Sequence, residues 1–153
     1  MISKAEETYT FLSQHTVASL STVSKEGEPW GANVYYTVSE KFIFYFMTHV
    51  ESKKCYNLKA NPKVALTVVA NKEQATVQLT GNATELSDDS QELKEAFRQL
   101  AHVRSPGDLR WTPPVSKMRN GKIVVFRVVP TFLKFSKFNT NHLPPRPDIE
   151  HII

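Results

Sequence analysis

The chain has 153 residues, of which 41% are hydrophobic and 22% charged, and its formal net charge is +4 at pH 7. This length and composition predict a single globular domain with a sizeable core. A charge of +4 suits an anionic ligand but is too small and too dispersed to indicate a nucleic-acid-binding protein. The single cysteine excludes an internal disulfide and, with five scattered histidines, gives no zinc-ligand spacing.

The sequence carries no feature typical of a membrane or exported protein. No apolar run approaches the length that spans a bilayer, and residues 1–15 do not have the layout of a signal peptide. The lone Cys55 suits a reducing compartment. We therefore expect a cytoplasmic protein with neither a membrane nor a nucleic acid as its partner.

The first third of the chain predicts a short helix followed by strands. Residues Lys4 to Gln14 place apolar side chains close to one helical face, and residues 16–23 alternate as a strand does. Residues 30–38 are rich in β-branched and aromatic side chains, and a turn at 39–41 joins them to the aromatic run 42–48. These two runs predict a hairpin, and the first strand is expected to pair with it as a meander.

The middle of the chain predicts a short helix, two strands and a longer helix. The period changes at Ser52, and Asn61-Pro62 ends the helix that starts there. Cys55 lies on the apolar face of that helix, so we expect a small buried side chain and not a nucleophile. Two strand-like runs follow, and Gly81 in the second predicts a bulge or a bend. Ser87 is expected to cap the longer helix.

The last third combines an irregular segment, a strand and a tail. Residues 122–138 predict one long strand or two short ones broken at Pro130, which cannot donate to a ladder. Residues 139–153 read as an extended, proline-containing tail. The total of six or seven antiparallel strands, joined by tight turns, and two or three helices predicts a mainly β, α+β domain built as a small barrel over residues 1–153.

The segment from Thr48 to Lys54 has the chemistry of an anion site. If Ser52 caps a helix, the N–H groups of the first turn have no acceptor within the helix and carry partial positive charge. Lys53 and Lys54 add two full charges there, and each is expected to weaken an isolated helix by roughly 0.3–1 kcal/mol. A phosphate would reverse that penalty through charge-assisted hydrogen bonds, with Thr48 as a further hydroxyl. A solvated helix start with an ordinary serine cap fits the same residues, and the pattern alone leaves both interpretations open.

The order of these features resembles the pyridoxamine 5'-phosphate oxidase-like family, the split-β-barrel flavoproteins. The likeness runs from Ala18 to Leu86, and its most specific part is Thr48, a three-residue gap and Ser52-Lys53-Lys54. Asn57-Leu58 and the run NPKVAL follow at the spacing of that family. The resemblance implies a split barrel and a homodimer with two FMN sites at the subunit interface.

The resemblance also implies which residues would contact FMN. They are Thr48, Ser52, Lys53 and Lys54 at the phosphate, Asn33, Val34 and Tyr35 on the strand beside the isoalloxazine ring, Met47 just before the phosphate-binding threonine, and Gln78 and Trp111 near the ring. Gln78 is preferred to Thr76, on the same strand face, because its amide can donate to or accept from the flavin pyrimidine edge. Trp111 either reaches across the dimer to cover the flavin or anchors its own loop by packing.

Two departures from the family pattern bear on the substrate. The oxidases carry a C-terminal Arg-x-His segment that grips the substrate phosphate, and residues 132–147 contain no such motif. The run GANVYY, residues 31–36, also lacks the basic residues that those enzymes place on the second strand. The expected protein is therefore a related flavoprotein and not the oxidase itself.

The leading functional hypothesis is an FMN-dependent oxidoreductase, in which the flavin performs the electron chemistry and the protein orients the ring. Its redox partner would be a nicotinamide or a small organic acceptor. The alternatives are a flavin carrier or sensor without turnover, a deazaflavin- or haem-binding relative, and a basic barrel that binds nucleic acid through residues 132–138. Haem would want an axial histidine, and none of the five falls in an evident ligand motif.

Overall fold

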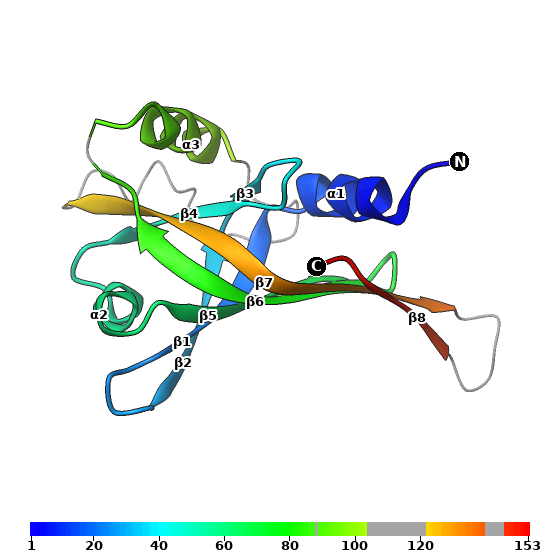
Figure 1. Ribbon diagram of the computed structural model, residues 1–153, viewed down its shortest axis with the longest axis horizontal. Coiled ribbons are helices and arrows are strands. Elements are labelled where there is room, and N and C mark those ends of the chain that lie inside the picture. Colours follow the sequence, from blue (N-terminus) through cyan, green and yellow to red (C-terminus); the bar gives the residue numbers. More distant parts are fainter. Residues whose placement is uncertain (88, 104–121, 140–145) are drawn as a thin grey trace.

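The computed structural model of the chain describes residues 1–87, 89–103, 122–139 and 146–153 (Figure 1). Three helices lie in these ranges: α1 (Lys4–Gln14), α2 (Lys53–Ala60) and α3 (Gln91–Ala101). The eight strands of the same ranges are β1 (Val17–Val23), β2 (Pro29–Tyr35), β3 (Thr37–Val38), β4 (Phe44–His49), β5 (Lys63–Ala70), β6 (Ala75–Glu85), β7 (Ile123–Asn139) and β8 (Arg146–His151).

The described strands form one antiparallel sheet in the order β2-β1-β5-β6-β7-β4-β3, and β8 pairs with β7. Figure 1 shows this sheet curled, with α3 over β4 and α2 near β5. The predicted mainly β, α+β split barrel is confirmed. The strand count exceeds the expected six or seven because Thr37–Val38 forms a short strand of its own and Arg146–His151, in the expected tail, adds β8.

The helix α1 begins and ends where the sequence predicts. Ser3 and Glu6 form a capping box, in which the Glu6 N–H donates to Ser3 Oγ at 3.1 Å and the Ser3 N–H donates to Glu6 Oε2 at 2.7 Å. Phe11 and Leu12 are buried on the face that covers one end of the sheet. Local capping chemistry therefore fixes the start of α1, and burial of its apolar face holds the helix in place.

The strand expected at 30–38 is interrupted at Tyr36. Its N–H donates to the carbonyl of Thr16 at 3.0 Å, and its buried hydroxyl donates to the carbonyl of Leu12 at 2.8 Å. These bonds tie the chain to the end of α1 between β2 and β3. The expected hairpin is therefore confined to β3 and β4, and the expected meander was wrong, because β2 pairs with β1 at the opposite end of the sheet order.

The bulge expected at Gly81 is confirmed. The register between β6 and β7 shifts between Thr80 and Gly81, and Gly81 lies opposite Pro130. Pro130 nevertheless does not break β7, which runs through 17 residues. On its other edge β7 pairs with β4 before Val129 and with β8 from Lys134 onward, so Pro130 falls in the gap between these two partners.

The helix α3 is capped by Ser90, and the prediction of Ser87 as its cap was wrong. The Ser90 side chain accepts from the N–H of Leu93 at 3.0 Å, while Ser87 belongs to the preceding turn and accepts from Ser90. Glu92 fixes the helix to the sheet, because it accepts from the hydroxyl of Tyr45 at 2.8 Å and from the guanidinium of Arg127 at 3.0 Å. Burial, together with the bond to Glu92, raises the pKa of Tyr45 to about 12.

The core divides into two clusters. The larger one fills the inside of the curled sheet and includes Phe44, Phe46 and the fully buried Cys55, as the sequence predicts for that cysteine. The smaller one lies under α3 and contains Met47 and Leu100. None of the helices in the described ranges is long and apolar enough to cross a membrane.

Candidate functional site

Two hydroxyl groups meet at the start of α2. The chain leaves β4 at His49 and turns, with the Ser52 N–H donating to the His49 carbonyl at 3.0 Å. Ser52 then caps α2, since its Oγ accepts from the Cys55 N–H at 3.2 Å. The same Oγ lies 2.8 Å from Oγ1 of Thr48, whose side chain is only 4% exposed. The two predicted hydroxyl groups thus lie side by side, and the hydrogen bond from the Cys55 N–H fixes the position of the Ser52 hydroxyl.

The start of α2 is electropositive. Its first turn contains Lys53 and Lys54 and no acidic residue. The first-turn N–H groups of a helix have no acceptor within the helix, and here that of Cys55 is bonded to the cap. Helix dipole and lysine charges therefore have the same sign at this end, which is unfavourable for the isolated helix and favourable for an anion.

An aromatic partner for Lys53 was not predicted from the sequence. Lys53 Nζ lies 4.3 Å from the centre of the Trp30 ring, on β2. Trp30 is 42% exposed, and a cation over an exposed ring gains roughly 0.5–1 kcal/mol. This contact offsets part of the unfavourable dipole term, so Lys53 has a structural reason for its position besides an anion. No local pattern in the sequence pairs Trp30 with a residue on α2.

Buried polar contacts fix α2 against β1. Asn57 Nδ2 donates to Thr22 Oγ1 at 3.0 Å, and both side chains are buried. Cys55 and Leu58 enter the core from the same helix, and burial raises the pKa of the Cys55 thiol. The thiol therefore stays protonated at neutral pH, which fits a packing role and not a nucleophilic one.

Two further predicted residues lie on the outer face of the sheet. The register forms a cross-strand row of Asn33, Ser19, Thr67 and Gln78 over β2, β1, β5 and β6. Asn33 and Gln78 are exposed, and Asn33 Oδ1 accepts from Ser19 Oγ at 2.8 Å. Side-chain amides at both ends of this row offer donors and acceptors to a flat ligand.

Three predicted residues are buried. Val34 belongs to the main core, Met47 packs in the cluster under α3, and Tyr35 is 5% exposed. The side chains of Val34 and Met47 therefore face the interior, and only their backbones are placed to meet a ligand. Trp111 lies outside the described residues.

Comparison with known proteins shows the family to which the chain belongs. The family model described as pyridoxamine 5'-phosphate oxidase matches residues 5–134. The chain belongs to the pyridoxamine 5'-phosphate oxidase family. Within this family, the pyridoxine/pyridoxamine 5'-phosphate oxidase of Vibrio vulnificus is 28% identical over 155 residues, covering 88% of this chain and 74% of that protein.

Solved structures similar to this family member include proteins with different ligands in their names. A heme-binding protein from Mycobacterium smegmatis has a TM-score of 0.71 at 19% identity, covering 99% of this chain and 59% of that one. A pyridoxamine 5'-phosphate oxidase-related, FMN-binding protein from Nostoc punctiforme has a TM-score of 0.61 at 15% identity, covering 97% and 93%. At these identities the likeness establishes the shared fold.

In this member of the pyridoxamine 5'-phosphate oxidase family, one chain does not bring all the predicted contacts together. Thr48 pairs with Val124 of β7, whereas Gln78 pairs with Lys134, ten residues further along that strand. Ten residues correspond to about 33 Å of extended strand. Strand alternation also places Thr48 on the inner side with Phe46, while Gln78 faces outward. The phosphate residues and Gln78 thus form two separate groups.

Proposed function

We propose that this protein binds FMN and uses it as an oxidoreductase, with the flavin phosphate at the start of α2. The observation that carries this proposal is the donor set there: the hydroxyls of Thr48 and Ser52, the first-turn amides, and two lysines with no acidic residue in the turn. A phosphate needs several donors and positive charge within one small volume, and this set fits it. Bound FMN would supply hydride or electron transfer, and the protein would orient it.

The outer face of the sheet supports a homodimer. Beside the row that ends at Asn33 and Gln78 runs a second row of Gly31, Ser21, Ala65 and Thr80. All eight residues of the two rows are uncharged, and Val69 nearby is 57% exposed. Interfaces are depleted in charged residues at their centre, so this face suits a second copy of the chain. A twofold dimer would let the partner's Gln78 approach a flavin held at α2, which one chain alone does not achieve.

The first experiment is the absorbance spectrum and mass of the purified protein, followed by titration with FMN. We expect a dimer that quenches FMN fluorescence and binds riboflavin, which lacks the phosphate, at least about tenfold more weakly. Adding reduced nicotinamide without oxygen is expected to bleach the bound flavin. Bound flavin that does not bleach with reduced nicotinamide would indicate a carrier or sensor, and a colourless monomer that ignores FMN would overturn the proposal. A Soret band without flavin would instead place the protein with the haem-binding relatives.

Trp30 is expected to support the phosphate site by holding Lys53. Trp30→Leu removes the ring but keeps an apolar side chain, and we expect FMN affinity to fall about two- to fivefold. Trp30→Phe keeps an aromatic face and should retain most of the affinity. Titration of both variants with FMN measures the effect. Tighter binding by Trp30→Leu would mean that the ring competes with the phosphate for Lys53.

A further inference from the structure

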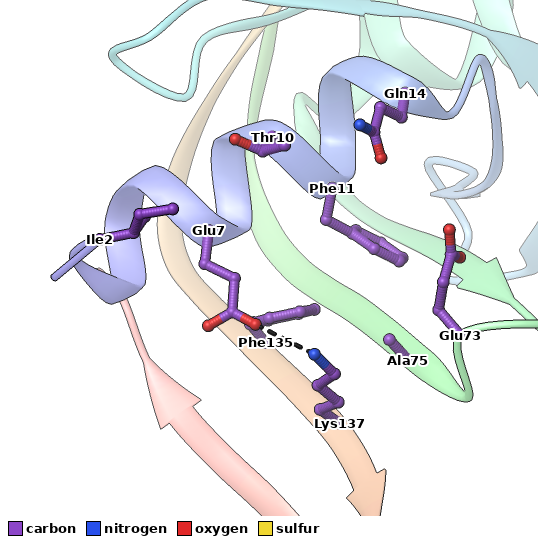
Figure 2. A pocket seen from close by; sticks show the side chains of 9 residues that line it. All are labelled: Ile2, Glu7, Thr10, Phe11, Gln14, Glu73, Ala75, Phe135 and Lys137. Carbon is purple, nitrogen blue, oxygen red and sulfur yellow. Dashed lines mark hydrogen bonds and ion pairs between the residues drawn. The ribbon is translucent and has the colours of Figure 1, made fainter.

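A cavity of about 320 Å³ lies between α1 and the paired strands β6 and β7 (Figure 2). Its volume equals that of about ten water molecules and reaches the lower end of the range of small-molecule sites. Of the residues predicted to contact FMN that lie in the described ranges, none is among those that line the cavity. It opens on the inner side of the sheet, whereas Asn33 and Gln78 face outward.

The floor of the cavity is apolar and preformed. Phe11 from α1 and Phe135 from β7 are buried, and their ring centres lie 5.3 Å apart. Ala75, at the start of β6, is also buried and adds only a methyl group. Figure 2 shows both rings directed into the space between the helix and the strands. This floor offers a ring-sized apolar surface with the small Ala75 at one side.

The two ends of the cavity are polar. At one end Lys137 Nζ lies 3.3 Å from Glu7 Oε1, and Lys4 lies 3.6 Å from the other oxygen of Glu7. At the other end Glu73 extends from the turn before β6 toward Gln14 of α1 (Figure 2). The ring of His15 lies 3.1 Å from Glu73 Oε2. Glu7 thus has two ammonium partners, whereas Glu73 meets Nε2 of the His15 ring, whose Nδ1 lies 2.6 Å from the carbonyl oxygen of Phe11.

We propose that this cavity binds a small organic amine with an aromatic or alicyclic body, its ammonium group bonded to Glu73. Among the described residues, the lining contains two carboxylates and one ammonium group, and that ammonium group is matched by Glu7. A carboxylate offers about four acceptor positions, so Glu73 can bond a ligand while it keeps His15. The body of the ligand covers Phe11 and Phe135, whose ring faces also attract a cation. An anionic ligand would meet Glu73, and in the described part of the lining the ammonium group of Lys137 is already paired with Glu7.

The first test asks whether the cavity prefers a positively charged ligand. It compares the binding of 2-phenylethylamine with that of 3-phenylpropionate, which has a similar size and the opposite charge. A ligand of about nine non-hydrogen atoms is expected to bind with a Kd on the order of 1 mM. Titration of the full chain, followed through the NMR signal of the Ala75 methyl group, is expected to show the amine at least about tenfold tighter than the carboxylate. Equal binding of the two probes, or no binding of the amine, would overturn the proposal.

Two substitutions locate the site. Glu73→Gln keeps the shape of the side chain and removes its charge, and we expect amine affinity to fall about three- to tenfold. Glu26→Gln, in the exposed turn between β1 and β2, makes the same change elsewhere and should have no effect. Ala75→Val narrows the floor and, followed through the ring signals of Phe11 and Phe135, should weaken the amine while leaving FMN binding unchanged. Amine binding that is indifferent to both Glu73→Gln and Ala75→Val would place the amine elsewhere and refute the assignment.

Discussion

Replacing Lys53 and Lys54 together by alanine is expected to weaken FMN binding about 30- to 150-fold. A hydrogen bond to a charged group contributes roughly 1.5–3 kcal/mol, and exposure of Lys53 to solvent reduces its share. We therefore assign about 2–3 kcal/mol to the pair, and 1.36 kcal/mol corresponds to a factor of ten. Fluorescence titration with FMN at low and at high salt measures the loss, which should shrink as salt screens the wild-type site.

The same double substitution also changes the stability of the flavin-free protein, but for a different physical reason. Loss of FMN binding can therefore be distinguished from loss of folding. Removing two charges that oppose the dipole of α2 should stabilise the helix by roughly 0.3–1 kcal/mol per residue. Loss of the contact between Lys53 and Trp30 acts in the other direction with a similar magnitude. The unfolding free energy without flavin should therefore change by no more than about 1.5 kcal/mol.

Lys41→Ala combined with Lys72→Ala is the matched control. Both lysines are exposed in turns outside α2, so this variant loses the same total charge. If the control weakens FMN as much as the double variant at 53 and 54, the overall charge attracts the ligand and α2 does not hold the phosphate. If FMN affinity of the double variant is unchanged while riboflavin still binds poorly, other groups bind the phosphate.

Features that depend on neighbours in the chain could be predicted from the sequence. Ser52 caps α2 because a short hydroxyl side chain reaches the N–H three residues on, whatever surrounds the helix. The bulge at Gly81 could be predicted because an isolated glycine in a strand-like run is itself a local signal of a bulge. The cap of α3 shows the limit of this approach, since two serines three residues apart both satisfy the local rule and only Ser90 is used.

Features that depend on partners distant in the sequence could not be predicted. Tyr36 interrupts a run of strand-forming residues because its hydroxyl finds the carbonyl of Leu12 at the end of α1. Trp30 meets Lys53 only because Asn57 and Thr22 fix α2 against β1. Propensity and spacing contain no information about such pairs.

The residues of the candidate site also fall into those placed by their neighbours in the chain and those placed by distant strands. Thr48 and Ser52 lie four residues apart, so their contact at 2.8 Å follows from one turn and was within reach of sequence reasoning. Gln78 reaches its position through the pairing of β6 with β5 and β7, and the register sets it far from Thr48. The resemblance to a family grouped these residues, but the fold of one chain separates them. For that reason we propose that a second protomer supplies the missing contacts.

Gly81→Ala is expected to destabilise the protein by about 3 kcal/mol, although it adds only one methyl group. A Cβ at this position would overlap the carbonyl oxygen of Val129 and lie 2.9 Å from Cα of Pro130. Both are backbone atoms of β7, so no side chain can move aside, and the two long strands must separate locally. Overpacking of this kind typically costs 1–3 kcal/mol or more. Gly81 has no positive φ, so the effect is steric and does not arise from backbone strain.

Gly31→Ala provides the matched comparison within the same sheet. A Cβ at Gly31, on β2, meets no atom within 4 Å, so alanine should be tolerated and should stabilise the chain by about 0.4–1 kcal/mol through the unfolded state. Urea unfolding should therefore shift in opposite directions for the two variants, and Gly81→Ala should lower the Tm by roughly 6–12 °C. Unchanged stability of Gly81→Ala would mean that β6 and β7 are not in close contact at the bulge. Destabilisation by Gly31→Ala would place another surface against the outer face, as the proposed dimer allows, and measuring it across protein concentrations would distinguish that contact from a local one.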